Sequence, residues 1–124
     1  MGRLRKHPIP DGVVLPARNY SHSTGYLYAA ELDNNTVKIG FSRAPWNRIR
    51  TLGASSRRHW GASVKKFTTG PAMDIRAALK LEQIALREYR KQFSPLGVRL
   101  GEFFPGADFA TAARLIGAPE AKAA

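Results

Sequence analysis

Glu82 is the residue whose position is hardest to explain by packing alone. The sequence predicts a long helix over residues 75–93, capped by Asp74, with apolar residues at steps of three, four and seven. This apolar stripe consists of Ile75, Leu79, Leu86, Tyr89 and Phe93. Glu82 lies in its middle, and an ionised, unpaired carboxylate there costs several kcal/mol. Glu82 therefore needs a cation, either an Arg or Lys in a structural ion pair or a metal ion.

Tyr28 and Lys38 are expected on one face of a β-hairpin. Residues 25–32 are rich in aromatic side chains and predict a strand, and residues 36–41 predict the strand that returns. The Asp-Asn-Asn sequence between them favours a turn, because Asn and Asp accept positive φ. With a three-residue turn, Ala30 faces Lys38 and Tyr28 faces Gly40, whereas a two-residue turn would shift this register.

Arg48 is expected on a short helix that follows the hairpin. The pattern predicts this helix over residues 45–52, with Ser42 as its N-cap and Gly53 at its end. Its buried stripe is formed by Trp46, Ile49 and Leu52. Arg48 and Arg50 flank that stripe, so both guanidinium groups can lean outward to a groove.

The charge of the chain indicates an anionic partner. Twenty Lys and Arg side chains stand against nine Asp and Glu, for a net charge of +11, and no acidic residue occurs between Asn34 and Met73. That stretch contains Lys38, Arg43, Arg48, Arg50, Arg57, Arg58, Lys65 and Lys66. A one-sided basic field attracts polyanions, so DNA is the expected partner. Its expected contacts are Arg43, Arg50, Arg57, Arg58, Lys65 and Lys66. A solvated basic surface is the alternative, and no long basic amphipathic helix favours a membrane.

Length and composition restrict the possible architectures. With 124 residues there is room for one domain, and the absence of cysteine excludes disulfides, thiol nucleophiles and Cys-ligated metals. No apolar run approaches the ~18–20 residues that span a bilayer, and no secretory signal is expected. We expect a flexible basic arm over residues 1–23, a domain over 24–117 and a tail over 118–124.

The remaining segments predict a small α+β domain. We expect a polar loop over residues 54–62, a third strand over 63–69, and an irregular segment or short edge strand over 97–104. A last helix, over 109–116, is capped by Asp108. This order favours a three-stranded antiparallel sheet packed by helices.

In this order the motifs resemble the GIY-YIG nuclease family, in particular its compact phage and bacterial branch. Gly25-Tyr26-Leu27-Tyr28 stands where the family has its first strand motif, and Lys38-Ile39-Gly40 stands for the second. Arg48 follows Gly40 by eight positions, as the family's essential arginine does, and Glu82 is in the place of its metal-binding glutamate. Gly101-Glu102-Phe103-Phe104 resembles a short aromatic motif that closes many domains of this branch. The likeness covers residues 24–116.

The resemblance implies an endonuclease that hydrolyses DNA phosphodiester bonds with Mg²⁺, or with Mn²⁺ in its place. Tyr28 would be the general base or orient the water, Arg48 would stabilise the phosphate, and Glu82 would bind the metal. Lys38 stands where the family's second motif often has Tyr, as it frequently does in the compact branch. Lys38 either favours the Tyr28 phenolate or contacts phosphate, and Tyr26 is the rival for the role of base.

Several alternatives stay open at this stage. Glu102 is either a carboxylate that supports the site or, as the sequence favours, a surface residue. His59 and Trp60 either stack on a base or pack as ordinary side chains. The chain as a whole could be a non-catalytic nucleic-acid-binding protein or an adaptor for an acidic protein. Monomer and homodimer are equally compatible with the sequence, and the cytoplasm of a bacterial or phage-infected cell is the expected location.

Overall fold

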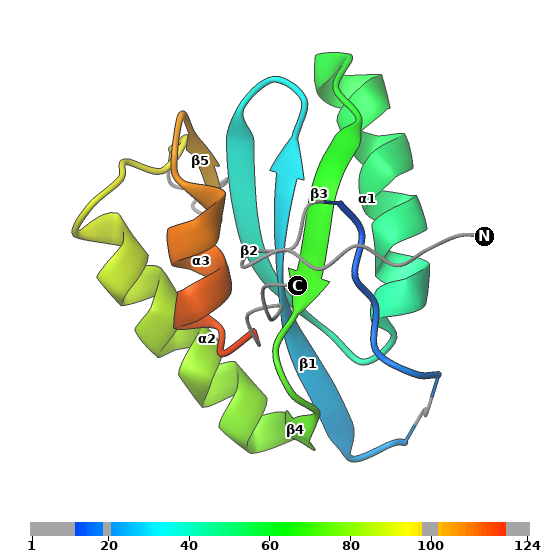
Figure 1. Cartoon of the computed structure of the whole chain (residues 1–124). Helices are drawn as coiled ribbons and strands as arrows, with labels where there is room; N and C mark the ends of the chain where they lie inside the picture. The colour runs from blue at the N-terminus through cyan, green and yellow to red at the C-terminus, as the bar shows by residue number, and fades with distance from the viewer. Residues whose placement is uncertain (1–11, 19–20, 98–101, 119–124) are drawn as a thin grey trace, which may run out of the picture.

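The structure is a computed structural model that describes residues 12–18, 21–97 and 102–118. Its helices and strands follow in the order β1 (Thr24–Leu32), β2 (Thr36–Ser42), α1 (Pro45–Trp60), β3 (Val64–Thr69), β4 (Met73–Asp74), α2 (Ile75–Arg90), β5 (Phe103–Pro105) and α3 (Phe109–Leu115). An antiparallel sheet stands between helices, as Figure 1 shows. The α+β class expected from the sequence is confirmed.

The sheet has more strands than the three that the sequence predicts. Its main order is β3-β1-β2-β5, and the two-residue β4 pairs with the beginning of β1. The edge strand β5 begins inside the segment 97–104, for which the sequence left an irregular stretch or a short edge strand open, and the strand alternative is confirmed. The sequence missed β4, because two residues are too short to have a periodicity of their own. The three residues of β5 pair with Thr36, Val37 and Lys38 at the start of β2, which places Phe103 directly opposite Lys38.

The hairpin forms with the three-residue turn. Tyr28 pairs with Gly40 and Ala30 pairs with Lys38, so the expected register is confirmed. Asn35 closes the turn with a φ of 66°, in the left-handed region that Asn accepts more readily than most residues. Because side chains alternate along a strand, Tyr28 and Lys38 share one face of the sheet.

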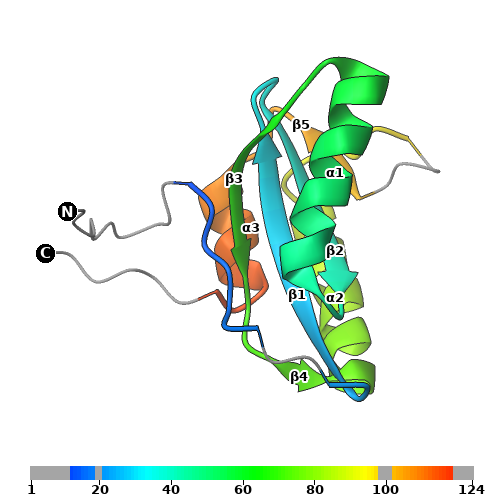
Figure 2. The same ribbon diagram turned by 90° about the vertical axis from the view of Figure 1, so that its right-hand side faces the viewer.

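The two faces of the sheet are covered by different helices. In the edge-on view of Figure 2, α1 lies on one side of the sheet and α3 on the other. The larger apolar cluster joins the sheet to α2 and α3 through Leu27, Ile39, Leu86, Tyr89, Phe104, Phe109 and Ile116, among others. The smaller cluster, beneath α1, consists of Tyr28, Ala30, Leu52 and Phe67, with Ile49, Val64 and Phe103 packed against it.

Helix α1 is longer than the sequence predicts. It runs to Trp60, so the polar loop expected over residues 54–62 is wrong for most of its length, and Arg57 and Arg58 lie on a helix. Gly53 does not end α1, since it is buried inside it. The helix ends at Gly61, whose φ of 65° suits the left-handed cap. Ser42 is not its N-cap, a position that Ala44 takes without a side-chain hydrogen bond.

Helices α2 and α3 begin where the sequence predicts. The Asp74 carboxylate accepts hydrogen bonds from the backbone N–H groups of Arg76 and Ala77, and Asp108 caps α3 in the same way through Thr111. Helix α2 ends at Arg90, before the expected residue 93. The predicted stripe is wrong at one position, because 41% of Leu79 is exposed. The small residues Ala78 and Ala85 are buried instead and allow close approach to the sheet.

Part of the expected arm lies against the sheet. Val13 forms a parallel bridge with Phe67, and the Val14 N–H donates to the Phe67 carbonyl at 2.7 Å. The Phe67 N–H in turn donates to the Gly12 carbonyl. This segment therefore continues the sheet beyond β3. The rest of the expected arm, residues 1–11 and 19–20, and all but the first residue of the expected tail lie outside the described residues.

Candidate active site

Tyr28 occupies the centre of the sheet face beneath α1. Its side chain is 1% exposed, and its ring stacks on Phe67 with 5.2 Å between centroids and 16° between planes. On the neighbouring strand the ring covers Gly40, where an added Cβ would come within 2.6 Å of both the Tyr28 hydroxyl oxygen and the ring carbon that bears it. The glycine of the second motif is therefore required by the close approach of the phenol.

Lys38 places a charged group next to this phenol. The residue is 7% exposed, and its Nζ donates to Glu102 Oε1 at 2.6 Å. The same ammonium lies 4.6 Å from the centroid of the Phe103 ring and 5.8 Å from that of Tyr28. A buried ammonium is stable only when it is paired, so the carboxylate of Glu102 and the two rings together hold Lys38 in the site.

The phenol of Tyr28 is subject to opposing influences. Burial raises the pKa of Tyr28 above its usual 10.0, while the nearby Lys38 and Arg48 cations lower it and Glu102 raises it. Burial is the largest of these contributions, so the net shift is upward. In this structure Tyr28 is a neutral phenol with two cations within electrostatic reach, and any further positive charge would favour the phenolate.

Arg48 projects from the first turns of α1 beside an open hollow of about 460 Å³. Ser42, Asn47 and Thr51 also line this hollow, so it lies where β2 leads into α1. Arg48 is exposed, yet its charge acts on the buried Tyr28 phenol. The guanidinium is therefore available to an anion from solvent and lies on the same side of the sheet as Tyr28 and Lys38.

Glu82, on α2, lies within electrostatic range of Lys38 and Glu102. Burial and the negative charge of Glu102 raise its pKa, and the positive charge of Lys38 lowers it. The sequence predicts a cation partner for Glu82, but within residues 12–18, 21–97 and 102–118 no ion pair involves this carboxylate. Lys38, the cation whose charge lowers the pKa of Glu82, is already paired with Glu102. Among the described residues, Glu82 is therefore a half-buried carboxylate with no contacting cation.

The donor set fits a hard divalent cation better than a softer metal. The part of the chain that the structure describes has no cluster of three or more His, Asp or Glu residues placed to hold a metal. Glu82, with Glu102 close enough to affect its pKa, offers carboxylate oxygens only. Mg²⁺ binds through one or two carboxylates plus water and substrate oxygens, so Glu82 and Glu102 are compatible with it.

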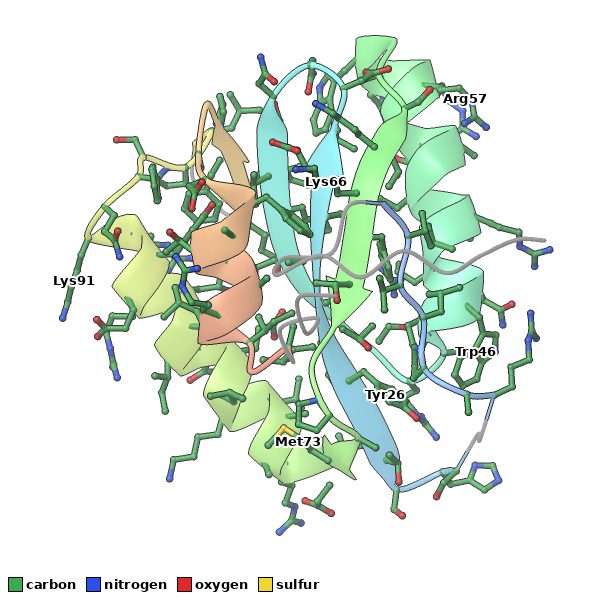
Figure 3. The ribbon with its side chains drawn as sticks, in the orientation of Figure 1. Tyr26, Trp46, Arg57, Lys66, Met73 and Lys91 are labelled. Carbon is green, nitrogen blue, oxygen red and sulfur yellow. The ribbon has the colours of Figure 1, made fainter. Side chains whose placement is uncertain are left out.

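Tyr26 is positioned differently from Tyr28, although both lie on the face that α1 covers. Its ring makes an edge-on contact with Trp46 at 6.2 Å between centroids, where β1 meets the start of α1. Figure 3 shows the two side chains together there. Lys38 lies over the Tyr28 ring, and Arg48 acts on the Tyr28 phenol. Of the two tyrosines, Tyr28 is therefore the one whose phenol lies among the charged groups of this face.

The predicted DNA contacts are only partly gathered around the site. Arg43 lines the hollow beside Arg48. Arg50 and Arg57, two and nine residues after Arg48, lie on the opposite flank of α1, because a helix turns by about 100° per residue. Lys66 lies on the face covered by α3, where it pairs with Glu31 at 3.8 Å and its Nζ lies 5.6 Å from the Phe109 ring centroid. Figure 3 shows Lys66 and Arg57 well apart. The two remaining predicted contacts, Arg58 near the end of α1 and Lys65 on β3, are exposed.

The sequence favours a surface role for Glu102, whereas in the structure its carboxylate accepts a hydrogen bond from Lys38. Glu102 stands beside β5, and the pairing of β5 with β2 brings its carboxylate to Lys38, 64 positions earlier in the chain. No local periodicity reveals such a contact. The only signal was a glutamate immediately before two phenylalanines, in the motif that the resemblance singled out.

No family model, no curated protein and no solved structure matches the chain in the three comparisons. Among the described residues, none of the helices has the length and apolar character required to cross a membrane. The site's interpretation therefore rests on its own residues and their geometry.

Proposed function

We propose that this protein is a metal-dependent DNA endonuclease of the GIY-YIG type. The observation that carries the proposal is the convergence of Tyr28, Lys38, Arg48 and Glu82 from two strands and two helices. The Lys38 ammonium lies 5.8 Å from the centroid of the Tyr28 ring, the Arg48 charge lowers the pKa of the Tyr28 phenol, and the Lys38 charge lowers the pKa of Glu82. These groups can together activate a water molecule, stabilise charge on a phosphate and bind a divalent metal, which are the tasks of phosphodiester hydrolysis.

Each side chain has a distinct role in the proposed reaction. Arg48, open to solvent beside the hollow, binds a nonbridging oxygen of the scissile phosphate and stabilises the charge that develops there. As a phenolate, Tyr28 would accept a proton from the attacking water, and as the neutral phenol it would orient that water through a hydrogen bond. Lys38 keeps its positive charge against the phenol and so favours the phenolate form. Glu102 holds Lys38 in place through their hydrogen bond.

Glu82 is the proposed ligand of the divalent cation, with Glu102 as the nearest second carboxylate. When bound, Mg²⁺ would supply positive charge that stabilises the leaving oxygen. The raised pKa of Glu82 supports this role, because burial and the negative charge of Glu102 both disfavour the ionised carboxylate and a bound cation would favour it.

The decisive experiment is a plasmid nicking assay with and without Mg²⁺. The unmodified protein should nick DNA only with Mg²⁺ or Mn²⁺. Arg48→Ala and Glu82→Ala should each lower the rate by at least about 10²-fold, the usual loss when a group that stabilises transition-state charge is removed. DNA binding should persist in Glu82→Ala, because it removes a negative charge.

Two control variants separate these effects from general loss of charge. Glu88→Ala removes a glutamate of the same helix that pairs with Lys91 at 3.0 Å, and Arg76→Ala removes an exposed arginine from the first turn of α2. Both should nick at the unmodified rate. If the unmodified protein binds DNA but never nicks it with either metal, the protein is a nucleic-acid-binding module. Failure to bind DNA at moderate salt would contradict both nucleic-acid functions and is the result that an adaptor for an acidic protein predicts.

A soluble protein acting on cytoplasmic DNA, in a bacterium or a phage-infected cell, is the setting that we propose for this activity. Its affinity for DNA should fall steeply as salt rises, because Lys and Arg contacts release condensed counterions from the phosphates. A flat salt dependence would contradict a DNA partner of any kind.

A further inference from the structure

An aromatic hollow lies next to the proposed site and takes no part in the proposed reaction. It has a volume of about 420 Å³ and is lined by Ser55, His59, Trp60 and Phe103. This size lies within the range of roughly 300–1,000 Å³ that is usual for small-ligand pockets. The indole of Trp60 and the ring of Phe103 meet edge to face with 4.7 Å between centroids, and they form the apolar part of its wall.

Phe103 connects this hollow to the proposed catalytic residues. It pairs with Lys38 across β5 and β2, and the Lys38 ammonium lies 4.6 Å from the centroid of its ring. A phosphate bound near Lys38 would therefore have the hollow on the other side of one phenyl ring. The sugar and base attached to that phosphate, or to its immediate neighbour, are the groups that can reach it.

The chemistry of the lining matches a nucleobase. Two aromatic side chains offer stacking surface, which accepts any base because every base has a π-face. The Ser55 hydroxyl and the His59 imidazole can exchange hydrogen bonds with the polar edge of a base. Arg58, next to His59 in the chain, is exposed near the end of α1 and can approach the phosphate backbone. A base that remains paired in a duplex is stacked on both faces, so only an unpaired base can enter.

We propose that this hollow binds an unpaired nucleobase adjacent to the scissile phosphate, so that the protein prefers DNA with an unpaired nucleotide at that position. The inference rests on the proposed function for its substrate class, but binding tests it separately from cleavage. It also gives His59 and Trp60 a common role that packing alone does not, because His59 is exposed beside the partly buried Trp60.

The test measures affinity without divalent metal for two duplexes of equal length, one fully paired and one with a single unpaired thymine. The unmodified protein should bind the second duplex about tenfold more tightly, within the contribution of one stacked base. Trp60→Leu, which keeps an apolar contact with Phe103, and His59→Ala should each reduce that preference to less than about threefold. Their affinity for the paired duplex should stay unchanged.

Phe93→Leu is the matched control, because it removes an aromatic ring that packs against Tyr89 on the other side of the sheet. It should keep the full preference for the unpaired thymine. Equal affinity of the unmodified protein for both duplexes overturns the inference. So does an equal loss on both duplexes in Trp60→Leu and His59→Ala.

Fluorescence gives an independent measurement. The chain has two tryptophans, so in Trp46→Phe the indole of Trp60 is the only one. A base stacked in the hollow should quench this fluorescence more with the unpaired thymine than with the paired duplex, and equal quenching overturns the inference. A protein that shows the binding preference but does not nick DNA retains the hollow and loses the proposed catalytic function. If the protein nicks both duplexes at the same rate and shows no binding preference, the proposed catalytic function stands and the inference about the hollow is wrong.

Discussion

The two faces of the sheet are built from the same strands but serve different purposes. On the face toward α2 and α3, the described residues form a continuous apolar cluster with large rings such as Tyr89 and Phe104. The face toward α1 has the smaller cluster, and its centre holds a tyrosine beside a nearly buried lysine. The hydroxyl of Tyr89 donates to a backbone carbonyl of Asp108, at 2.6 Å. The Tyr28 phenol instead lies among charged groups.

This difference indicates how a small domain supports a polar site. Apolar burial on one face provides most of the folding free energy, at about 25 cal/mol per Å² of apolar area. That surplus allows the other face to keep Lys38 and Tyr28 buried, although such groups cost stability. Substitutions on the face toward α2 and α3 should therefore lower stability more than activity. Substitutions on the face toward α1 should lower activity more than stability.

The largest stability effect is expected from Phe104→Ala. Phe104 is fully buried and meets Tyr89 edge to face, 4.7 Å between centroids, so truncation leaves a cavity in the larger cluster. It should lower the free energy of unfolding by about 3–5 kcal/mol in a urea titration. A loss below about 1 kcal/mol would show that this face does not carry the main core.

Gly40→Ala should have an intermediate effect on stability and a large one on nicking. An added Cβ at Gly40 would lie 2.6 Å from the ring of Tyr28, which is held on its other side by Phe67. Overpacking of this kind costs about 1–3 kcal/mol and displaces the phenol. The measurement is a urea titration beside the nicking assay. Nicking at the unmodified rate would contradict the proposed role of Tyr28.

Glu82→Gln should have the smallest effect on stability, and it should be a gain. The pKa of Glu82 is raised in the folded state, so its contribution to stability is present at low pH and is lost as pH rises through that pKa. At neutral pH the uncharged Gln should therefore raise the free energy of unfolding, by less than about 1 kcal/mol for this partly exposed group.

The pH dependence distinguishes this prediction from a structural role. The stability gain of Glu82→Gln should shrink as pH falls toward ~4, where the carboxyl is protonated in the unfolded chain as well. Unfolding curves at several pH values measure it. A loss of stability at neutral pH would mean that Glu82 forms a structural ion pair with an Arg or Lys, which is one of the two explanations that the sequence offers for its position.

Local patterns were sufficient for the elements that position most of the site. Alternation and turn residues predicted the register that places Tyr28 opposite Gly40, and Asp74 and Asp108 marked the starts of their helices. The length of α1 was missed because Gly53 suggests an end, whereas burial against the sheet keeps it helical. Leu79 was misplaced because Ala78, a weaker hydrophobic signal, fits closer to the sheet.

The sequence alone determined the hairpin face, the basic stretch and the one carboxylate that interrupts an apolar stripe, because each depends on neighbours along the chain. Only the tertiary structure decided that Glu102 holds Lys38, that Phe103 lies between Lys38 and an aromatic hollow, and that Lys66 lies on the other face. Those relations join residues tens of positions apart through strand pairing and helix packing. No local periodicity encodes such contacts, since their distances depend on the whole fold.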